Sequence, residues 1–286
     1  MQLIIKKEDS SSPFWQPAKA IEREVFPPDT RISITDTNRP PYQWICKIRV
    51  RYENPATKQG GWSEGSGVLI RSDLVLTCAH VLLGLGKPSG HTRFSKMEIY
   101  PGSNNRQASP FGMYESNKFL VHPQYGKVAP RNGLDKSFVN FPYDYGLIKL
   151  DKPVSYANST SFWGKYATSS LVRLDEKCYL EKEVKAGGYR FGSNDQEVGA
   201  GAISRINAQN VDKFLSDRIN IHLADTEKSQ SGGPVWIEGS AGNCTIPCLV
   251  GIHVGGNQTM QMNFCLRITY EVLKTIAQLE KALNKK

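Results

Sequence analysis

Three residue types that together can cleave an acyl bond occur in this chain in the order His80, Asp144 and Ser231. A serine hydroxyl becomes a nucleophile when an imidazole takes its proton and a carboxylate holds that imidazole in the right tautomer. Each of the three lies at the boundary of a predicted strand, where functional residues often lie: in "VLTCAHVL", "YDYGLIKL" and "SQSGGPVW". We therefore predict nucleophilic serine catalysis, with Ser231 as nucleophile, His80 as general base and Asp144 as orienting carboxylate.

Taken singly, each residue also has an ordinary structural interpretation. A lone histidine after an apolar run is commonly a hydrogen-bonded core or surface residue, and an aspartate before a strand is usually a turn former. Serine followed by glycines is also common in turns. Beside a nucleophile, however, Gly232 and Gly233 let the backbone turn tightly, so that the N–H groups of Ser229 and Ser231 can converge on one oxygen. The combination favours catalysis, with these two N–H groups as the oxyanion hole.

Most of the chain predicts short strands separated by turn residues. Segments such as "YQWICKIRVRY", "MEIYPG", "KCYLEKEV", "CLVGIHVGG" and "MNFCLRI" are rich in β-branched and aromatic residues and are bounded by Gly, Pro, Asn or Asp. Residues 127–141 predict a long loop that enters the next strand. The pattern is typical of an all-β barrel or sandwich.

Only the end of the chain predicts a helix, from Thr269 to Leu283. The apolar residues there follow one stripe at three- and four-residue spacing: Val272, Ile276, Leu279 and Leu283. We expect this helix to pack against the β body.

Composition limits the function classes. With 286 residues, 39% hydrophobic and 22% charged, the chain can form a sizeable core as two domains or one enlarged barrel unit. The net charge of +9 is spread along the sequence without a dense basic run, so we expect no nucleic-acid partner, but an easier encounter with acidic peptides. No apolar run approaches the roughly 20 residues of a membrane span, so we expect no membrane partner.

Six cysteines leave the redox state open. Cys244 and Cys248, in "NCTIPC", could close a small disulfide loop. The other four are isolated in strand-like segments, where free buried thiols are commoner: Cys46, Cys78, Cys178 and Cys265. Since no second close pair of cysteine or histidine is visible, we expect neither a metal site nor a cofactor.

The sequence resembles the chymotrypsin-fold serine peptidases, and among them the bacterial glutamyl endopeptidases. Those proteins carry a stretch like D-T-x-x-G-Q-S-G-x-P, against which this chain has "DTEKSQSGGP" from Asp225. Further matches are "HPQY" at His122, "NCTIPC" before "LVGIHVGG", and "LRITYEVL" leading into the terminal helix. The similarity runs from about Thr30 to the C-terminus.

The resemblance implies two antiparallel six-stranded β-barrels with the cleft between them. Residues 25–150 would form the first barrel with His80 and Asp144, and residues 151–268 the second with Ser231. Residues 269–286 would be the C-terminal helix, and residues 1–24 an N-terminal extension or pro-segment.

The resemblance also implies cleavage after glutamate, or aspartate, in a protein or peptide substrate. His253 and Thr226 would bind the substrate carboxylate, and Val254, Gly255 and Gly256 would pair its backbone as an added strand. Without the resemblance, His253 would be interpreted as a strand residue filling the second barrel. Asp225 could instead select a basic residue, which keeps a trypsin-like specificity as an alternative. We expect a monomer.

One departure from the family defines a competing class. The family has glycine where this chain has Ser229, and a Cβ resists the backbone geometry that glycine allows there. A second departure is that Cys78 precedes His80 by two residues, whereas the family has a cysteine directly after or near its histidine. The alternative is a catalytically impaired, peptidase-like module that binds proteins without cutting them, although the joint presence of His80, Asp144 and Ser231 argues against it.

The N-terminal segment suggests processing. In the resembling family the mature chain begins just upstream of a segment like "DTRISIT", which here places the start near Val25, directly after Glu24. Cleavage there would free an amine that approaches the pocket near His253. Alternatively, residues 1–24 are an extension of an enzyme active as synthesised. The opening residues do not show a secretory signal, whereas family members are secreted, so the compartment stays open.

Overall fold

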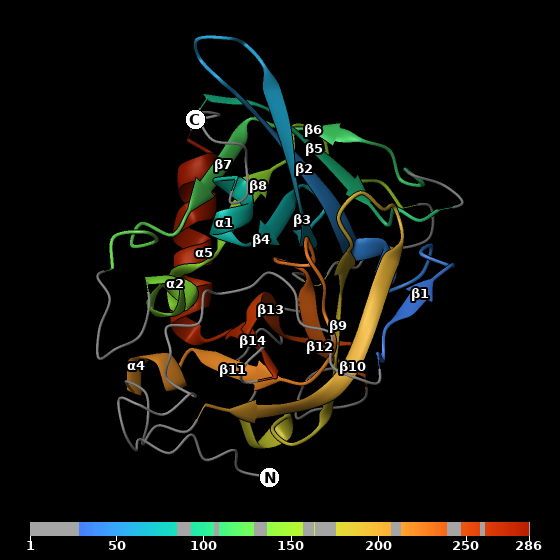
Figure 1. Cartoon of the computed structure of the whole chain (residues 1–286), viewed down its shortest axis with the longest axis vertical. Helices are drawn as coiled ribbons and strands as arrows, with labels where there is room; N and C mark the ends of the chain where they lie inside the picture. The colour runs from blue at the N-terminus through green and yellow to red at the C-terminus, as the bar shows by residue number, and fades with distance from the viewer. Residues whose placement is uncertain are drawn as a thin grey trace.

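The computed structural model describes residues 29–84, 93–105, 109–128, 136–156, 163, 176–206, 213–238, 247–257 and 261–285. In these residues two antiparallel β-sheets form the body of the molecule, and a helix at the C-terminal end lies along one of them (Figure 1). Residues 1–24, and with them the expected cleavage at Glu24, lie outside the described residues, so processing stays a prediction.

The first sheet has seven strands in the order β6-β5-β2-β3-β4-β8-β7. Their bounds are β2 Ile45–Glu53, β3 Gly60–Arg71, β4 Leu74–Thr77, β5 Arg93–Pro101, β6 Tyr114–Glu115, β7 Lys118–Val121 and β8 Gly146–Lys149. Within the described residues, its two end strands β6 and β7 do not pair with each other, so this sheet is a half-open barrel.

The second sheet closes into a six-stranded barrel, because β9 pairs with both β12 and β10. Its strands are β9 Glu183–Tyr189, β10 Gln196–Arg205, β11 Ile219–His222, β12 Pro234–Ile237, β13 Cys248–Asn257 and β14 Met262–Arg267. A short strand, β1 (Ile32–Ile34), adds to β10 from outside the barrel. The predicted all-β, chymotrypsin-like architecture with a terminal helix is confirmed, although the first of the two predicted six-stranded barrels is a seven-stranded, half-open sheet in the described residues.

Short helices replace part of what the sequence predicts as loop or strand. Their bounds are α1 Ala79–Leu82, α2 Lys136–Asn140, α4 Lys213–Ser216, and the 3-10 helices η2 Tyr42–Trp44, η3 Phe141–Tyr143 and η4 Glu176–Cys178. The strand predicted to reach His80 therefore ends at Thr77, and α2 and η3 occupy the end of the predicted 127–141 loop. Pro142 favours the start of η3 because its fixed φ suits a first helical turn.

The predicted terminal helix is α5 (Tyr270–Leu283). Thr269 caps it, since the Thr269 hydroxyl accepts a hydrogen bond from the N–H of Val272, and the predicted apolar stripe is buried. Although α5 follows the second barrel in the chain, it packs on β7 and β8 of the first sheet, and Arg71 forms an ion pair with Glu280. The C-terminal helix is therefore held against the first sheet by apolar packing and an ion pair.

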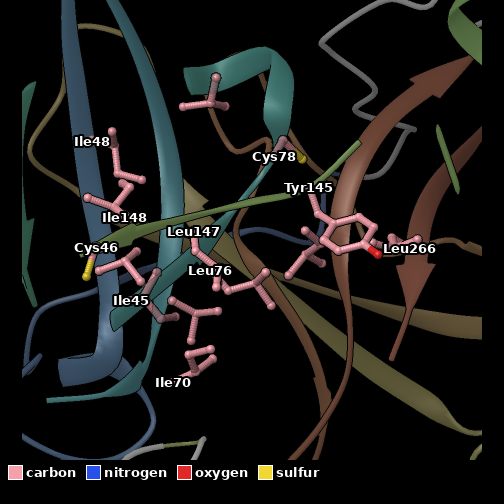
Figure 2. Packing of buried hydrophobic residues seen from close by; sticks show 14 of the residues in the cluster. Ile45, Cys46, Ile48, Ile70, Leu76, Cys78, Tyr145, Leu147, Ile148 and Leu266 are labelled. Atoms are coloured by element: carbon pink, nitrogen blue, oxygen red, sulfur yellow. The ribbon is translucent and has the colours of Figure 1, made fainter. Parts of the chain in front are cut away.

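One apolar core runs through the first sheet and into the second barrel (Figure 2). Ile45 and Ile48 of β2, Leu76 of β4 and Leu147 of β8 are fully or almost fully buried, and Leu266 of β14 joins them. Burying each such side chain contributes about 1.5–3 kcal/mol. The continuity of this core holds the two sheets in one fixed relation.

The cysteines follow the expected division where they are described. Cys46, Cys78, Cys178 and Cys265 are free thiols, and Cys248 is disulfide-bonded. Cys244, the expected partner of Cys248, lies outside the described residues. None of the described helices has the length and apolar character that a bilayer span requires.

Candidate active site

The pairing of two strands in the first sheet brings His80 and Asp144 together. Thr77, the last residue of β4, pairs with Gly146, the first residue of β8. His80 follows three residues after that pair, in the single turn of α1, and Asp144 precedes it by two, just after η3. The register therefore sets both side chains at one end of the sheet.

His80 and Asp144 share two hydrogen bonds and are both buried. His80 Nδ1 lies 2.6 Å from Asp144 Oδ2, and the backbone N–H of His80 donates to Asp144 Oδ1 at 2.9 Å. An ionised carboxylate only accepts hydrogen bonds, so this contact places the imidazole proton on Nδ1. Nε2 is then the nitrogen that can take a proton from a hydroxyl group.

Cys78 lies beside this pair, and its ligand atom is within 4.8 Å of those of His80 and Asp144. A soft metal ion would need the thiolate form of the cysteine. Burial, and next the charge of Asp144, raise the pKa of Cys78 well above its usual value. The protonated thiol instead donates to the carbonyl of His253 at 3.2 Å, which links the first sheet to β13.

The loop of residues 225–233 carries the candidate nucleophile, and we call it the nucleophile loop. Ser66 of β3 binds it twice: its N–H donates to the Ser231 carbonyl at 2.9 Å, and its hydroxyl donates to the Ser229 carbonyl at 2.8 Å. Gly232 has φ +84°, and a Cβ there would lie 2.2 Å from Thr77 Oγ1. Only glycine allows the loop to approach the start of α1 this closely.

The hydroxyl of Ser231 is buried and has no hydrogen-bond partner among the described residues. The structure thus brings Ser231 against the first sheet but does not show a hydrogen bond from it to His80. Such bonds are often long before substrate binds and tighten in the reacting complex. The nucleophile loop therefore lies against Ser66 of β3 and against Thr77 and Cys78, just before His80, and the catalytic role of the three residues stays a prediction.

Ser229 adopts the left-handed conformation that glycine would favour, with φ +77°. For a non-glycine residue this costs about 1–2 kcal/mol. The carbonyl of Lys228 accepts a hydrogen bond from the N–H of Phe191 at 3.2 Å, so the N–H of Ser229, in the same trans peptide, faces the opposite way. No backbone carbonyl in the described part of the chain accepts from the N–H of Ser229 or Ser231. Both N–H groups are therefore available donors.

Three buried polar side chains lie on the nucleophile loop, β13 and β11. Thr226 Oγ1 and His253 Nε2 are buried and unpaired within the described residues. His253 Nδ1 lies 3.3 Å from Nε2 of His222, a fully buried residue of β11. Burial lowers the pKa of His222 to about 3, and burial together with His222 and His80 lowers that of His253 well below its usual value. Both imidazoles are therefore neutral at pH 7.

Beyond Ile252 the outer edge of β13, where the sequence predicts substrate pairing, has no strand partner among the described residues. β12 pairs with β13 only between Cys248 and Ile252. In the described structure Gly255 and Gly256 pair with β14 alone, and Val254 lies at a register shift between His253 and Gly255. Gly255 has φ +152°, and a Cβ there would lie 3.3 Å from the ring of Phe141. An extended peptide could add along this edge as a further strand.

Asp225 is hydrogen-bonded to Thr30, near the first of the described residues. Its carboxylate accepts hydrogen bonds from the N–H and the hydroxyl of Thr30, both at 2.7 Å, and the residue is buried. Both hydrogen bonds fall on the same oxygen, Oδ2.

Two residues of the site do not stand out in the sequence. His222 alternates with Ile221 and Ile219 in "RINIHLAD", a pattern that normally places the polar residues in solvent, whereas Asn220 and His222 are fully buried. Ser66 is one of several serines near glycines. Its partner Ser229 lies 163 positions away, so no local pattern marks it.

Comparisons with known proteins bear on the family and the fold of this chain. A family model described as a trypsin-like peptidase domain matches residues 65–243, which include His80, Asp144 and Ser231. Among solved structures, the chain is similar to a Glu endopeptidase determined in complex with MPD, with a TM-score of 0.60 and 19% sequence identity over 89% of this chain and 98% of that chain. At this identity the likeness shows the fold alone. No curated protein matches this sequence.

The buried neutral histidines predict a pH dependence of stability. In the unfolded chain the His222 imidazole binds a proton below about pH 6.5, whereas in the folded protein it stays neutral until about pH 3. The contribution of His222 to the free energy of unfolding is therefore complete above about pH 6.5 and is lost as the pH falls toward about 3. In His222→Gln, the slope of unfolding free energy against pH between about pH 4 and 6 should fall by about one proton, or about 1.4 kcal/mol per pH unit. Denaturant titrations at several pH values measure it. Equal slopes in both proteins would contradict a buried neutral His222.

Proposed function

Because this chain belongs to the trypsin-like peptidase family, we propose that it is a serine endopeptidase that cleaves after glutamate. The observation that carries the proposal is a set of buried polar atoms without partners in the described structure: Ser231 Oγ, Thr226 Oγ1 and His253 Nε2. Buried polar groups are normally hydrogen-bonded, so unpaired ones call for an explanation. A substrate bound between the nucleophile loop and β13 would supply the missing partners.

The reaction follows from the proton positions. Ser231 Oγ attacks the substrate carbonyl carbon while its proton passes to Nε2 of His80, and Asp144 stabilises the imidazolium through Nδ1–H. The N–H groups of Ser229 and Ser231 donate to the oxyanion of the tetrahedral intermediate. His80 then protonates the leaving amine, which leaves an acyl group on Ser231. A water molecule, activated by His80 in the same way, releases the acid and restores the hydroxyl.

The preference for glutamate rests on two donors at the end of a histidine pair. If His222 Nε2–H donates to His253 Nδ1, the proton of the neutral His253 is on Nε2, where it can donate to a substrate carboxylate. The hydroxyl of Thr226 is the second donor. An apolar substrate side chain would leave both groups buried and unpaired, which costs about 1–3 kcal/mol per group.

The alternatives are less well supported. A trypsin-like preference for basic residues would need Asp225, whose carboxylate is bound by Thr30. A module that binds without cutting would not need the 2.6 Å contact between His80 and Asp144. The left-handed backbone of Ser229 also favours an enzyme over a binding module. Its strain is retained, and its N–H group has no backbone acceptor within the described residues and can serve the oxyanion.

A fluorophosphonate probe should label the protein at Ser231, because only a serine activated by an imidazole reacts quickly with it. Labelling should be lost in Ser231→Ala. Asp144→Asn should fold but lose about 10⁴-fold in turnover, since the imidazole would take the wrong tautomer. Mass spectrometry of the labelled peptide and peptide-hydrolysis rates measure both effects.

Ser229→Ala is the matched control for Ser231→Ala, because it keeps the backbone N–H and removes a hydroxyl two residues away. It should still be labelled. Labelling at another serine, or none in a folded sample, would instead indicate the binding module.

The two proposed carboxylate donors can be tested with a pair of peptides that differ only in glutamate or glutamine at the cleaved residue. Wild type should prefer the glutamate peptide. Thr226→Val should lower kcat/KM for it by about 10- to 100-fold, because a hydrogen bond to a charged group contributes about 1.5–3 kcal/mol. Steady-state kinetics with both peptides measure the change.

Thr57→Val makes the same chemical change at an exposed position in the turn between β2 and β3, and should leave both rates unchanged. Equal loss on the two peptides in Thr226→Val would mean that Thr226 does not bind the substrate carboxylate.

A further inference from the structure

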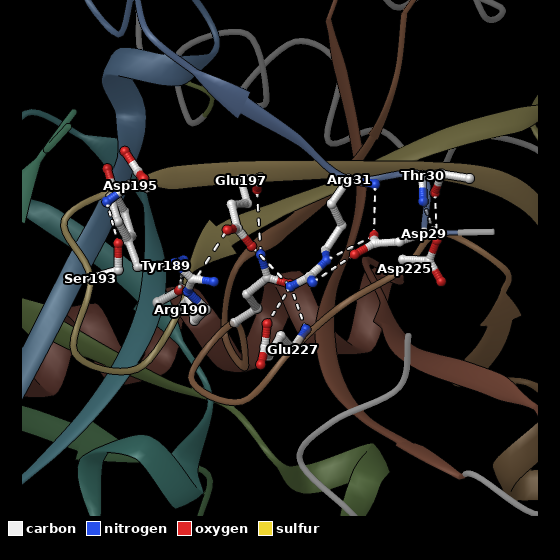
Figure 3. A network of polar contacts seen from close by, with 12 residues as sticks. Asp29, Thr30, Arg31, Tyr189, Arg190, Ser193, Asp195, Glu197, Asp225 and Glu227 are labelled. Carbon is white, nitrogen blue, oxygen red and sulfur yellow. Dashed lines mark hydrogen bonds and ion pairs between the residues drawn. The ribbon is translucent and has the colours of Figure 1, made fainter. Parts of the chain in front are cut away.

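Residues 29–34, which we call the N-terminal strap, lie against the second barrel beside the nucleophile loop (Figure 3). Ile32 to Ile34 form β1 and pair with Gln196 to Val198 of β10. Just before β1, Thr30 binds Asp225 of the nucleophile loop. The strap thus bridges β10 and the loop that carries Thr226.

Arg31 is the charged centre of this contact. Its Nη1 lies 2.9 Å from Glu197 of β10 and 2.5 Å from Glu227 of the nucleophile loop. Its Nε and Nη2 donate to the two oxygens of Asp29 at 3.0 and 2.8 Å, which fixes the plane of the guanidinium. The side chains of Arg31, Glu197 and Glu227 are only 12%, 10% and 15% exposed, so solvent screens their charges weakly.

The two glutamates that Arg31 binds are directly connected to the site. Glu227 follows Thr226 in the chain. Gln230, the neighbour of Ser231, joins the same two segments, because its side-chain oxygen accepts from the N–H of Glu227 at 2.7 Å and its side-chain nitrogen donates to the carbonyl of Glu197 at 3.5 Å. The cluster is therefore tied by hydrogen bonds to the nucleophile loop on both sides of Ser229.

Without Arg31, three carboxylates would lose their shared cation: Glu197 and Glu227 close to Thr226, and the more exposed Asp29. Burial raises the pKa of Glu197, the charge of Glu227 raises it further, and Arg31 and then Arg190 lower it. Arg190 stands 3.9 Å from Glu197 and is 46% exposed, so it compensates less. A substrate carboxylate would then meet repulsion of the same sign.

We propose that Arg31 is a specificity-determining positioning residue, which offsets part of the negative charge of Glu197 and Glu227 so that an acidic substrate side chain can bind near Thr226 and His253. The inference rests on the proposed preference for glutamate. The N-terminal strap would then influence which substrates bind through the charge of Arg31, without contacting the substrate.

The test compares kcat and KM for the glutamate and glutamine peptides in wild type, Arg31→Ala, Arg31→Lys and Arg39→Ala. Arg31→Ala should lower kcat/KM for the glutamate peptide by about tenfold or more, mainly through KM, and change that for the glutamine peptide by less than about threefold. Arg31→Lys should recover most of the preference because it restores the charge. Arg39→Ala is the matched control, since Arg39 is exposed and pairs only loosely with Asp36 at 3.7 Å.

A second variant keeps the test decisive if Arg31→Ala folds poorly. Glu227→Gln removes one negative charge and leaves Arg31 in place, so it should lower KM for the glutamate peptide and leave the rate of fluorophosphonate labelling unchanged. Added to Arg31→Ala, it should restore part of the preference.

The outcomes separate the two proposals. A wild type without preference for glutamate overturns the proposed specificity, and the role of Arg31 with it. A wild type that prefers glutamate, together with an Arg31→Ala that keeps the same preference, overturns the role of Arg31 alone. Equal losses on both peptides with slower labelling would mean that Arg31 only stabilises the fold.

Discussion

Hydrogen bonds of one residue, Ser66, hold the nucleophile loop of the second barrel against the first sheet. Its N–H and hydroxyl bind the carbonyls of Ser231 and Ser229, and the same hydroxyl accepts from the N–H of Tyr189 at 2.8 Å. The carbonyl of Ser66 in turn accepts from Thr77, at the end of β4 that leads to His80. Since each barrel carries only part of the site, its geometry depends on this junction.

The site combines unpaired polar groups with local strain. The unpaired groups of Thr226 and His253 each cost about 1–3 kcal/mol, and the left-handed Ser229 adds about 1–2 kcal/mol. The continuous core between the sheets offsets these costs. A bound substrate carboxylate would accept hydrogen bonds from Thr226 and His253 and so remove the cost of leaving these groups unpaired. The groups that destabilise the free site would therefore favour acidic substrates.

The sequence predicted features that depend on local pattern. The stripe from Val272 to Leu283 gave the terminal helix, and the strand boundaries near His80 and Asp144 located the pair that the structure joins. Ser66, His222 and Arg31 were not predicted, because each matters through partners far along the chain. Arg31 and Glu227, for example, are 196 positions apart. The buried His222 also breaks the rule that polar residues alternating in a strand face solvent.

The most direct test of the account is the set of bonds that the protein cuts in an unbiased library of peptides. New C-termini are identified by mass spectrometry after digestion with wild type and with Ser231→Ala in parallel. We predict that wild type cuts after glutamate, with aspartate second, and that Ser231→Ala cuts nothing. Cleavage after arginine or lysine, or the same cuts by Ser231→Ala, would contradict it.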